Sequence, residues 1–136
     1  MSTAVDLWIL WKRVHETMRN RIVGEVTSEV GLAGPDLSVL AYLFGAGGSA
    51  RQNAIAVGLG WDRTRLSHLL TRMEERGYVT RTKLTNGVEV TIGPKGRRQL
   101  EASMPTLEAA AHRHLLAKLD DGDAEHLRRI LERLLA

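Results

Sequence analysis

The chain has 136 residues, of which 43% are hydrophobic and 26% are charged, and its net charge is +3 at neutral pH. These proportions are typical of one soluble globular domain, and no run approaches the ~20 apolar residues that a membrane-spanning helix needs. The lack of cysteine excludes disulfide bonds, thiolate catalysis and a cysteine redox switch. The first residues do not resemble a signal peptide, so we expect a cytoplasmic protein with no membrane partner.

The charge is distributed unevenly along the chain. Residues 51–98 hold ten lysines and arginines against four acidic residues, whereas the rest of the chain holds nine basic and twelve acidic residues. A basic middle between acidic flanks favours a module that binds a polyanion, although a solvated basic surface would give the same count.

Residues 4–30 have the apolar spacing of one long helix. Apolar side chains recur every three or four residues, at Leu7, Trp11, Val14, Met18, Ile22 and Val26. At ~1.5 Å per residue this helix is roughly 40 Å long, so we expect part of it to pack beyond the chain's own core. Gly31 and Gly34 end it, and Pro35 suits the first turn of a short apolar helix that runs to a glycine turn.

Two further helices separated by a glycine turn come next. The first covers Gln52–Leu59. Asp62 is a good N-cap for the second, which runs from Arg63 to Glu75, and Gly77 follows as its C-terminal cap.

The spacing of apolar residues then changes to a period of two. Residues 78–84 and 88–92 alternate as β-strands do, and the Asn-Gly pair between them is the strongest short signal for a hairpin turn. The helical period returns in residues 95–118, where Pro105 should kink the helix, and a last helix covers 125–135. The chain is thus predicted to be mainly α, with about six helices and a two-stranded β-hairpin.

On a helical wheel, the helix over residues 63–75 divides into two faces. Its apolar side chains fall within about 60° of one side, at Leu66, Leu69, Leu70 and Met73. The other face carries polar and basic side chains with no acid between Arg63 and Arg72, whereas an ordinary solvent face mixes acids and bases. Helix, turn, helix and hairpin in this order predict a winged helix-turn-helix over residues 52–92, with its second helix in the major groove of DNA.

Ten side chains of this region are candidate DNA contacts, because their groups hydrogen-bond to phosphates or base edges. They are Arg63, Thr64, Arg65, Ser67, His68, Thr71 and Arg72 on the second helix and Arg81, Lys83 and Asn86 on the hairpin. A hairpin in this position lies along the DNA backbone or reaches into the minor groove, although it could also serve only to complete the fold.

Several segments of the chain resemble the MarR family of transcriptional regulators. They are Ile55-Ala56-Val57-Gly58-Leu59-Gly60, Arg63-Thr64-Arg65-Leu66-Ser67-His68, Arg72-Met73-Glu74-Glu75-Arg76-Gly77-Tyr78-Val79-Thr80-Arg81 and Ile92-Gly93-Pro94-Lys95-Gly96. The long first and last helices also agree with the family, so the resemblance covers nearly the whole chain. It implies a dimeric regulator of transcription, in most cases a repressor.

The hairpin departs from the family's pattern. The family usually has an Asp and an Arg close together in this wing, with the Arg reaching DNA, whereas residues 82–88 here are short and contain neither. Lys83 could substitute, but a lysine cannot copy the flat fork of an arginine in a narrow groove. The hairpin therefore lacks the residues with which the family's wing reaches DNA, and it either contacts DNA through other side chains or only completes the fold.

The resemblance implies a homodimer joined through the first and last helices. The sequence supports this independently, because the helices at both ends carry more apolar positions than one small core can cover. We therefore divide the single domain 1–136 into dimerisation helices, 4–30 and 95–136, and a DNA-binding lobe, 35–92. Two recognition helices about 34 Å apart would read successive major grooves, which predicts a pseudo-palindromic operator in double-stranded DNA.

Regulators of this family often bind a small aromatic or lipophilic effector between the dimer helices and the DNA-binding lobe. The candidate pocket residues here are Trp8, Trp11, His15 and Arg19, which share one helix face, and His112 from the late helix. The alternative is that the tryptophans form part of the dimer core.

Three other classes of function fit the sequence less well. His112 and His114 point about 200° apart on a helix and cannot hold one metal ion. Glu108 and His112 do share a face, but this pair is a weak signal, so we expect no metal and no cofactor. An enzyme would need a phosphate-binding loop or clustered acids beyond the solvated turn at 120–123. The sequence has neither, so we do not expect an enzyme. A winged helix that binds only protein would carry a mixed-charge or apolar face where Arg65 and His68 lie.

Overall fold

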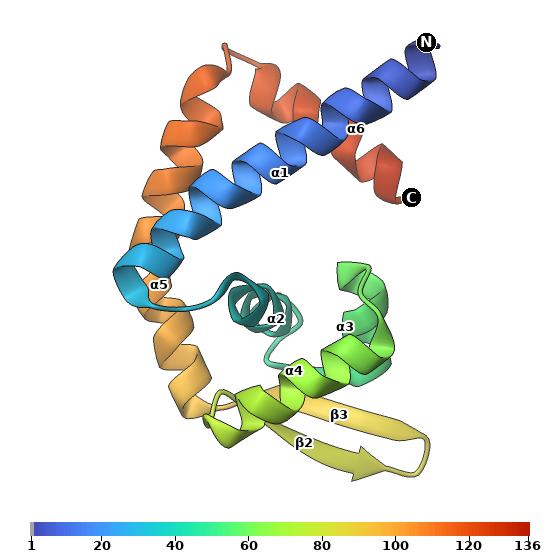
Figure 1. Ribbon diagram of the computed structural model, residues 1–136, viewed down its shortest axis with the longest axis vertical. Helices are drawn as coiled ribbons and strands as arrows, with labels where there is room; N and C mark the ends of the chain where they lie inside the picture. Colours follow the sequence, from blue (N-terminus) through green and yellow to red (C-terminus); the bar gives the residue numbers. More distant parts are fainter. Residues whose placement is uncertain (1) are drawn as a thin grey trace. The chain divides into compact units, whose positions relative to one another are not determined.

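The computed structural model describes residues 2–136, which contain six α-helices, one short 3₁₀ helix and three β-strands (Figure 1). The elements are α1 Thr3–Val30, α2 Gly34–Gly45, β1 Ser49–Arg51, α3 Gln52–Leu59, α4 Arg63–Glu75, β2 Val79–Leu84, β3 Gly87–Ile92, α5 Pro94–His114, η1 Leu116–Lys118 and α6 Asp123–Leu135. None of the helices in these residues combines the length and apolarity that a membrane span requires.

The chain divides into two compact units. Thr27–Met104 form one, here called the sheet unit, and the chain up to Val26 forms the other together with Pro105–Ala136, here called the terminal unit.

The core of the sheet unit is formed by α2, α3, α4 and the sheet. Its fully buried side chains include Leu40 and Leu43 of α2, Ile55 of α3, Leu66, Leu70 and Met73 of α4, Val79 of β2 and Val90 of β3. The four apolar positions predicted for the helix over 63–75 are all buried, which confirms the helical wheel. Because that stripe faces inward, the opposite side of α4 lies in solvent.

The predicted hairpin is confirmed, and a third strand completes the sheet. β2 and β3 pair antiparallel, from Val79 opposite Ile92 to Leu84 opposite Gly87. The sequence did not predict β1, which pairs with the other edge of β3 and gives the strand order β1-β3-β2. β1 has only three residues, too few to show an alternating pattern, and it is held by pairing with residues about forty positions further along the chain.

Both ends of α4 are fixed by local bonds that the sequence predicted. The Asp62 side chain accepts a hydrogen bond from the backbone N–H of Arg65 at 3.0 Å, as an N-cap does. At the other end, Gly77 has a φ of +78°, and the Tyr78 N–H donates to the carbonyl oxygen of Met73 at 2.9 Å. α4 is therefore a well-delimited helix that presents a fixed outer face.

The turn after β3 depends on a close approach of two backbones. A Cβ on Gly96, at the start of α5, would collide with the backbone carbonyl of Tyr78, so only glycine fits there without movement.

The helix predicted for 95–118 is wrong at its end, because α5 stops at His114 and Leu115 leaves the helical region, with φ −120° and ψ −67°. Residues 116–118 form the 3₁₀ turn instead.

In the terminal unit, one acidic side chain joins α1 to the end of α5. Glu25 accepts two hydrogen bonds from Nη1 of Arg113, at 2.7 and 2.8 Å, and its Oε2 lies 2.7 Å from Nε2 of His114. The bond from Arg113, followed by the contact with His114, lowers the pKa of the Glu25 carboxyl below its ordinary value. No local pattern in the sequence predicts this cluster, because Glu25 and Arg113 lie 88 positions apart.

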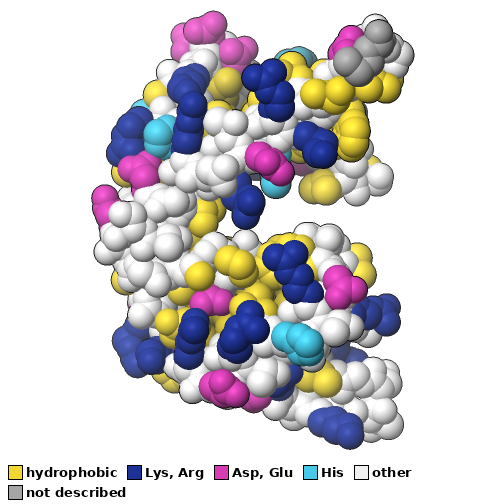
Figure 2. Space-filling view, in the orientation of Figure 1, with side chains coloured by type: hydrophobic (Ala, Val, Ile, Leu, Met, Phe, Trp, Pro, Cys, Tyr) yellow, Lys and Arg dark blue, Asp and Glu magenta, His cyan; other side chains and the backbone are white. Residues whose placement is uncertain are grey.

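Much of the apolar surface of the terminal unit is exposed. Leu7 and Trp8 of α1 are 66% and 60% exposed, and hydrophobic side chains are visible along the N-terminal half of this helix (Figure 2). α6 is strongly amphipathic but has no buried residue, and Leu134 and Leu135 near its end are 68% and 89% exposed. The chain alone therefore leaves uncovered the apolar faces that the sequence analysis assigned to a dimer.

Candidate nucleic-acid interface

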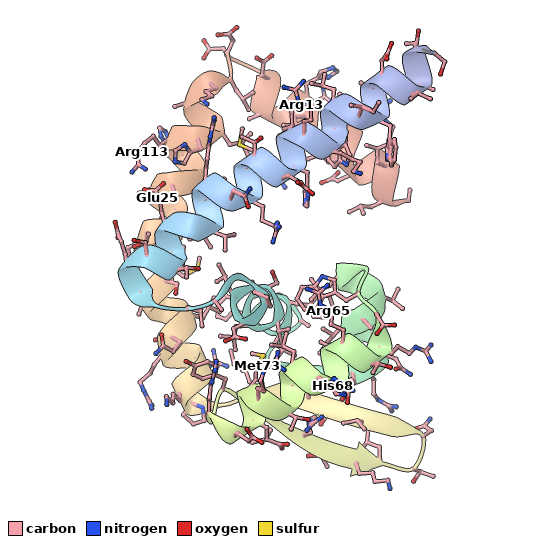
Figure 3. The ribbon with its side chains drawn as sticks, in the orientation of Figure 1. Arg13, Glu25, Arg65, His68, Met73 and Arg113 are labelled. Carbon is pink, nitrogen blue, oxygen red and sulfur yellow. The ribbon has the colours of Figure 1, made fainter. Side chains whose placement is uncertain are left out.

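The outer face of α4 carries most of the predicted DNA contacts. Ser67 is half-buried, and six other candidates are exposed, namely Arg63, Thr64, Arg65, His68, Thr71 and Arg72. Lys and Arg side chains gather over α4 and the hairpin in the face shown in Figure 2, and Arg65 and His68 are labelled in Figure 3. Within residues 2–136, neither Arg63 nor Arg65 forms an ion pair, so their guanidinium groups are available to an anionic ligand.

The start of α4 has the electrostatics of an anion site. The first turn holds no acidic residue, and the N-terminus of any helix carries a partial positive charge from its unpaired N–H groups. The Asp62 cap uses only one of these groups. Arg63 and Arg65 therefore add full charges where the backbone already favours phosphate.

Arg81 of β2 is bonded to α4 rather than left free. Its backbone N–H donates to Oε2 of Glu74 at 2.9 Å, and its Nε donates to Oε1 of the same carboxylate at 3.2 Å. Its Nη2 donates to Oγ1 of Thr71 at 2.9 Å, and that hydroxyl donates to the carbonyl oxygen of Ser67. These bonds tie the hairpin to the outer edge of α4, so Arg81 and Thr71 hold the two parts in register.

The remaining hairpin candidates, Lys83 and Asn86, are both exposed. Asn86 sits in the turn and accepts a hydrogen bond through Oδ1 from Nη1 of Arg51, at 3.1 Å. Arg51 was not among the predicted contacts, because no local pattern links it to a turn 35 residues away. Pairing of β1 with β3 brings the two together, and the only sequence signal was the position of Arg51 within the basic middle of the chain.

A buried acid also supports the C-terminal end of α4. Asp36 of α2 is 3% exposed, and its Oδ2 lies 3.3 Å from Nη1 of Arg76, the residue that caps α4. Burial raises the pKa of the Asp36 carboxyl, while the charges of Arg76 and Arg72 act in the opposite direction. Neither Asp36 nor Arg76 was among the functional residues predicted from the sequence.

The predicted ligand-pocket residues all lie in the terminal unit and are all exposed. Trp8, Trp11, His15 and Arg19 are on α1 and His112 is on α5. The rings of Trp11 and His15 stack with centroids 6.5 Å apart. In residues 2–136, no hydrogen bond, ion pair or ring contact joins His112 to the four side chains of α1.

One shallow depression lies beside Trp8. It has a volume of about 280 Å³ and is lined by Trp8, Ile9, Lys12, Arg13 and Glu16, so it includes one of the five predicted residues. The Lys12 ammonium lies 4.9 Å from the centre of the Trp8 ring. The structure thus places an aromatic face and mixed charges together there.

No group of three or more potential metal ligands is found in the described part of the chain.

Comparison with known proteins agrees with this architecture. A family model described as a domain of unknown function, DUF7343, matches residues 33–90. No curated protein sequence matches the chain significantly. Solved structures match it over nearly its whole length.

Three of these solved structures bear on the fold. AbsC, a MarR family transcriptional regulator from Streptomyces coelicolor, is 21% identical with a TM-score of 0.83, covering 99% of this chain and 94% of its own. A mutant of MarR from E. coli complexed with operator DNA is 20% identical with a TM-score of 0.83, covering 98% and 96%. CouR from Rhodococcus jostii RHA1 bound to p-coumaroyl-CoA is 22% identical with a TM-score of 0.82, covering 98% and 94%. The chain therefore has the fold seen in MarR family transcriptional regulators.

Proposed function

We propose that this chain is a transcriptional repressor that binds a pseudo-palindromic operator as a homodimer, with α4 in the major groove. The observation that carries the proposal is the outer face of α4, which is exposed, basic and free of acids from Arg63 to Arg72. The opposite face is buried from Leu66 to Met73, so the outer face has a fixed orientation in the sheet unit. A structural relative of the same fold has been solved with operator DNA.

Within this face, the N-terminal half of α4 is the part best suited to base edges. Arg65 is exposed and has no carboxylate partner in residues 2–136, so its guanidinium can donate two parallel hydrogen bonds to O6 and N7 of guanine. Ser67 and His68 follow on the same helix and can bind phosphate oxygens or bases. Arg63 and Arg72 flank them as phosphate contacts.

The exposed apolar faces of α1 and α6 support the homodimer. Side chains as large as Leu7, Trp8 and Leu134 are exposed in one unit of a small protein, and such patches usually mark an interface. We propose that a second copy covers these faces through the helices at both ends of the chain. Two copies related by a two-fold axis present two α4 helices, which is why the operator is pseudo-palindromic.

We further propose that a small aromatic or lipophilic ligand controls binding to the operator. The exposed aromatic face at Trp8 and Trp11, with His15, Arg19 and His112 in the same unit, is the candidate site. One relative of this fold has been solved with p-coumaroyl-CoA, which contains an aromatic group. Such a ligand releases DNA only if it binds the free dimer more tightly than the DNA-bound dimer. A ligand with equal affinity for both states would not shift the equilibrium between them.

The test is selection of genomic DNA fragments by the purified chain, followed by sequencing and by titration of one selected duplex at several salt concentrations. We expect fragments that share an inverted repeat and an affinity that falls steeply with salt, because phosphate contacts release counterions. A chain that enriches no sequence, or whose binding does not respond to salt, would instead be a winged-helix module for protein contacts.

A further inference from the structure

The tip of the β2–β3 hairpin is contacted by an arginine from another strand. Arg51, the last residue of β1, donates from Nη1 to Oδ1 of Asn86 at 3.1 Å and lies 3.5 Å from the backbone oxygen of the same residue. Arg51 is exposed, and the rest of its guanidinium forms no hydrogen bond or ion pair with residues 2–136. A guanidinium has five N–H donors, so most of them remain available to a ligand at the hairpin tip.

The position of Arg51 in the chain points to the same conclusion. It immediately precedes α3, where Ser, Thr, Asp or Asn would cap the helix. The structure shows no side-chain cap at this position, and the side chain extends to the hairpin instead. The position where a capping residue would stabilise α3 thus holds an arginine whose side chain is directed at the hairpin turn.

The hairpin tip lies on the side of α4 that we assign to the DNA. Arg81 ties β2 to Thr71 and Glu74 in the C-terminal half of α4, and β2 then runs back along the helix. Its tip therefore lies toward the N-terminal end, where Arg63 and Arg65 are exposed (Figure 1). When α4 occupies a major groove, the next surface along the DNA is the flanking minor groove.

We propose that Arg51, oriented by Asn86, is the residue with which the hairpin contacts that flanking minor groove. The inference rests on the proposed function, since it names the second contact of the same DNA interface. A guanidinium is planar and more weakly hydrated than an ammonium, and it enters the narrow, strongly negative minor groove of A·T-rich DNA. Lys83, the cation on the hairpin itself, lacks that planar group.

The experiment measures the affinity of the full-length chain for a duplex that the wild type selects from a random-sequence library. The variants are Arg51→Ala, Arg51→Lys and Asn86→Ala, and the control is Arg21→Ala, an exposed arginine of the terminal unit. A second duplex carries diaminopurine in place of adenine in the flanks. This base adds an amino group to the minor groove and keeps the major-groove pattern of adenine.

We expect Arg51→Ala to weaken binding at least about tenfold, as loss of one base-edge contact does. Arg51→Lys should recover only part of the affinity, and Asn86→Ala should fall between the wild type and Arg51→Ala. Diaminopurine flanks should weaken the wild type and leave Arg51→Ala unchanged. Melting curves of all variants should match the wild type, because Arg51 is exposed.

Three results would overturn the inference while leaving the proposed function intact. Arg51→Ala could bind as tightly as Arg21→Ala. Arg51→Lys could restore full affinity and full sensitivity to diaminopurine, which would mean that a point charge on phosphate is sufficient. Diaminopurine in the flanks could leave the affinity of the wild type unchanged. That result would exclude a minor-groove contact whatever the variants do. A wild type that selects no duplex at all would overturn the proposed function itself.

Discussion

Arginines of the same sheet unit have different roles because their surroundings differ. Arg65 is exposed and has no ion pair in residues 2–136, whereas Arg81 is 21% exposed in its side chain and is bonded to Glu74 and Thr71. Arg76 is 56% exposed in its side chain but pairs with the buried Asp36 at the end of α4. Charge alone therefore does not identify a DNA contact, and the bonds within the protein decide which guanidinium groups are available.

Replacement of Asp36 should change how stability depends on pH. Burial raises the pKa of this carboxyl in the folded chain, so it favours folding below its unfolded pKa and loses that contribution as the pH rises through the folded pKa. Asp36→Asn removes the ionisation and keeps an oxygen for Arg76. We expect the stability of the wild type relative to Asp36→Asn to fall as the pH rises from about 4 toward neutrality.

Urea unfolding of both proteins at several pH values measures this difference. Asp121→Asn, at an exposed aspartate, is the control and should show no such trend. A difference between the wild type and Asp36→Asn that is constant with pH, or that grows in favour of the wild type, would contradict the account of the buried acid.

At the scale of elements, the features that the sequence predicted correctly are those fixed by near neighbours. The cap at Asp62 and the stripe from Leu66 to Met73 each depend on residues a few positions apart. The bonds of Arg51 with Asn86, of Arg76 with Asp36 and of His114 with Glu25 join residues 35 to 89 positions apart, and they leave no local pattern. For that reason β1 and the Arg51 contact could not be predicted. The end of α5 was also missed, because apolar spacing continues past the residue where the backbone leaves the helix.

The joint between α1 and α5 should depend on pH in the opposite sense to Asp36. Hydrogen bonds from Arg113 and contact with His114 lower the pKa of Glu25, so its contribution to stability is present above the unfolded pKa and is lost as the pH falls through the folded pKa. Glu25→Gln should therefore be destabilised most at neutral pH. The deficit should shrink as the pH falls below the ordinary glutamate value of 4.5.

Thermal melting across that pH range tests the joint, with Glu101→Gln at an exposed position of α5 as the control. If Glu25→Gln were as stable as the wild type at neutral pH, the ion pair with Arg113 and the hydrogen bond with His114 would contribute nothing to the fold.

At the scale of the whole molecule, the exposed apolar faces of α1 and α6 are the feature that one chain leaves unexplained. Leu134 is 68% exposed, so Leu134→Glu should not disturb the fold of a single chain. In the proposed dimer the same change buries an unpaired charge, which is strongly unfavourable. We expect the variant to remain folded, to sediment as a monomer and to lose most of its affinity for DNA.

Sedimentation velocity and circular dichroism measure the two expected effects separately. Glu132→Lys, an exposed position on the polar side of α6, is the control and should stay dimeric. A wild type that sediments as a monomer, or a Leu134→Glu variant that remains a dimer, would contradict the assignment of this interface.

The central claim is that the outer face of α4 reads DNA, and titration of a selected duplex with Arg65→Ala tests it most directly. We expect this substitution to cost about 1–3 kcal/mol of specific binding and to relax the preference at one base pair of each half-site. Arg21→Ala should bind as the wild type does, and both variants should melt as the wild type does. Unchanged affinity and unchanged sequence preference for Arg65→Ala would contradict the claim that α4 is the recognition helix.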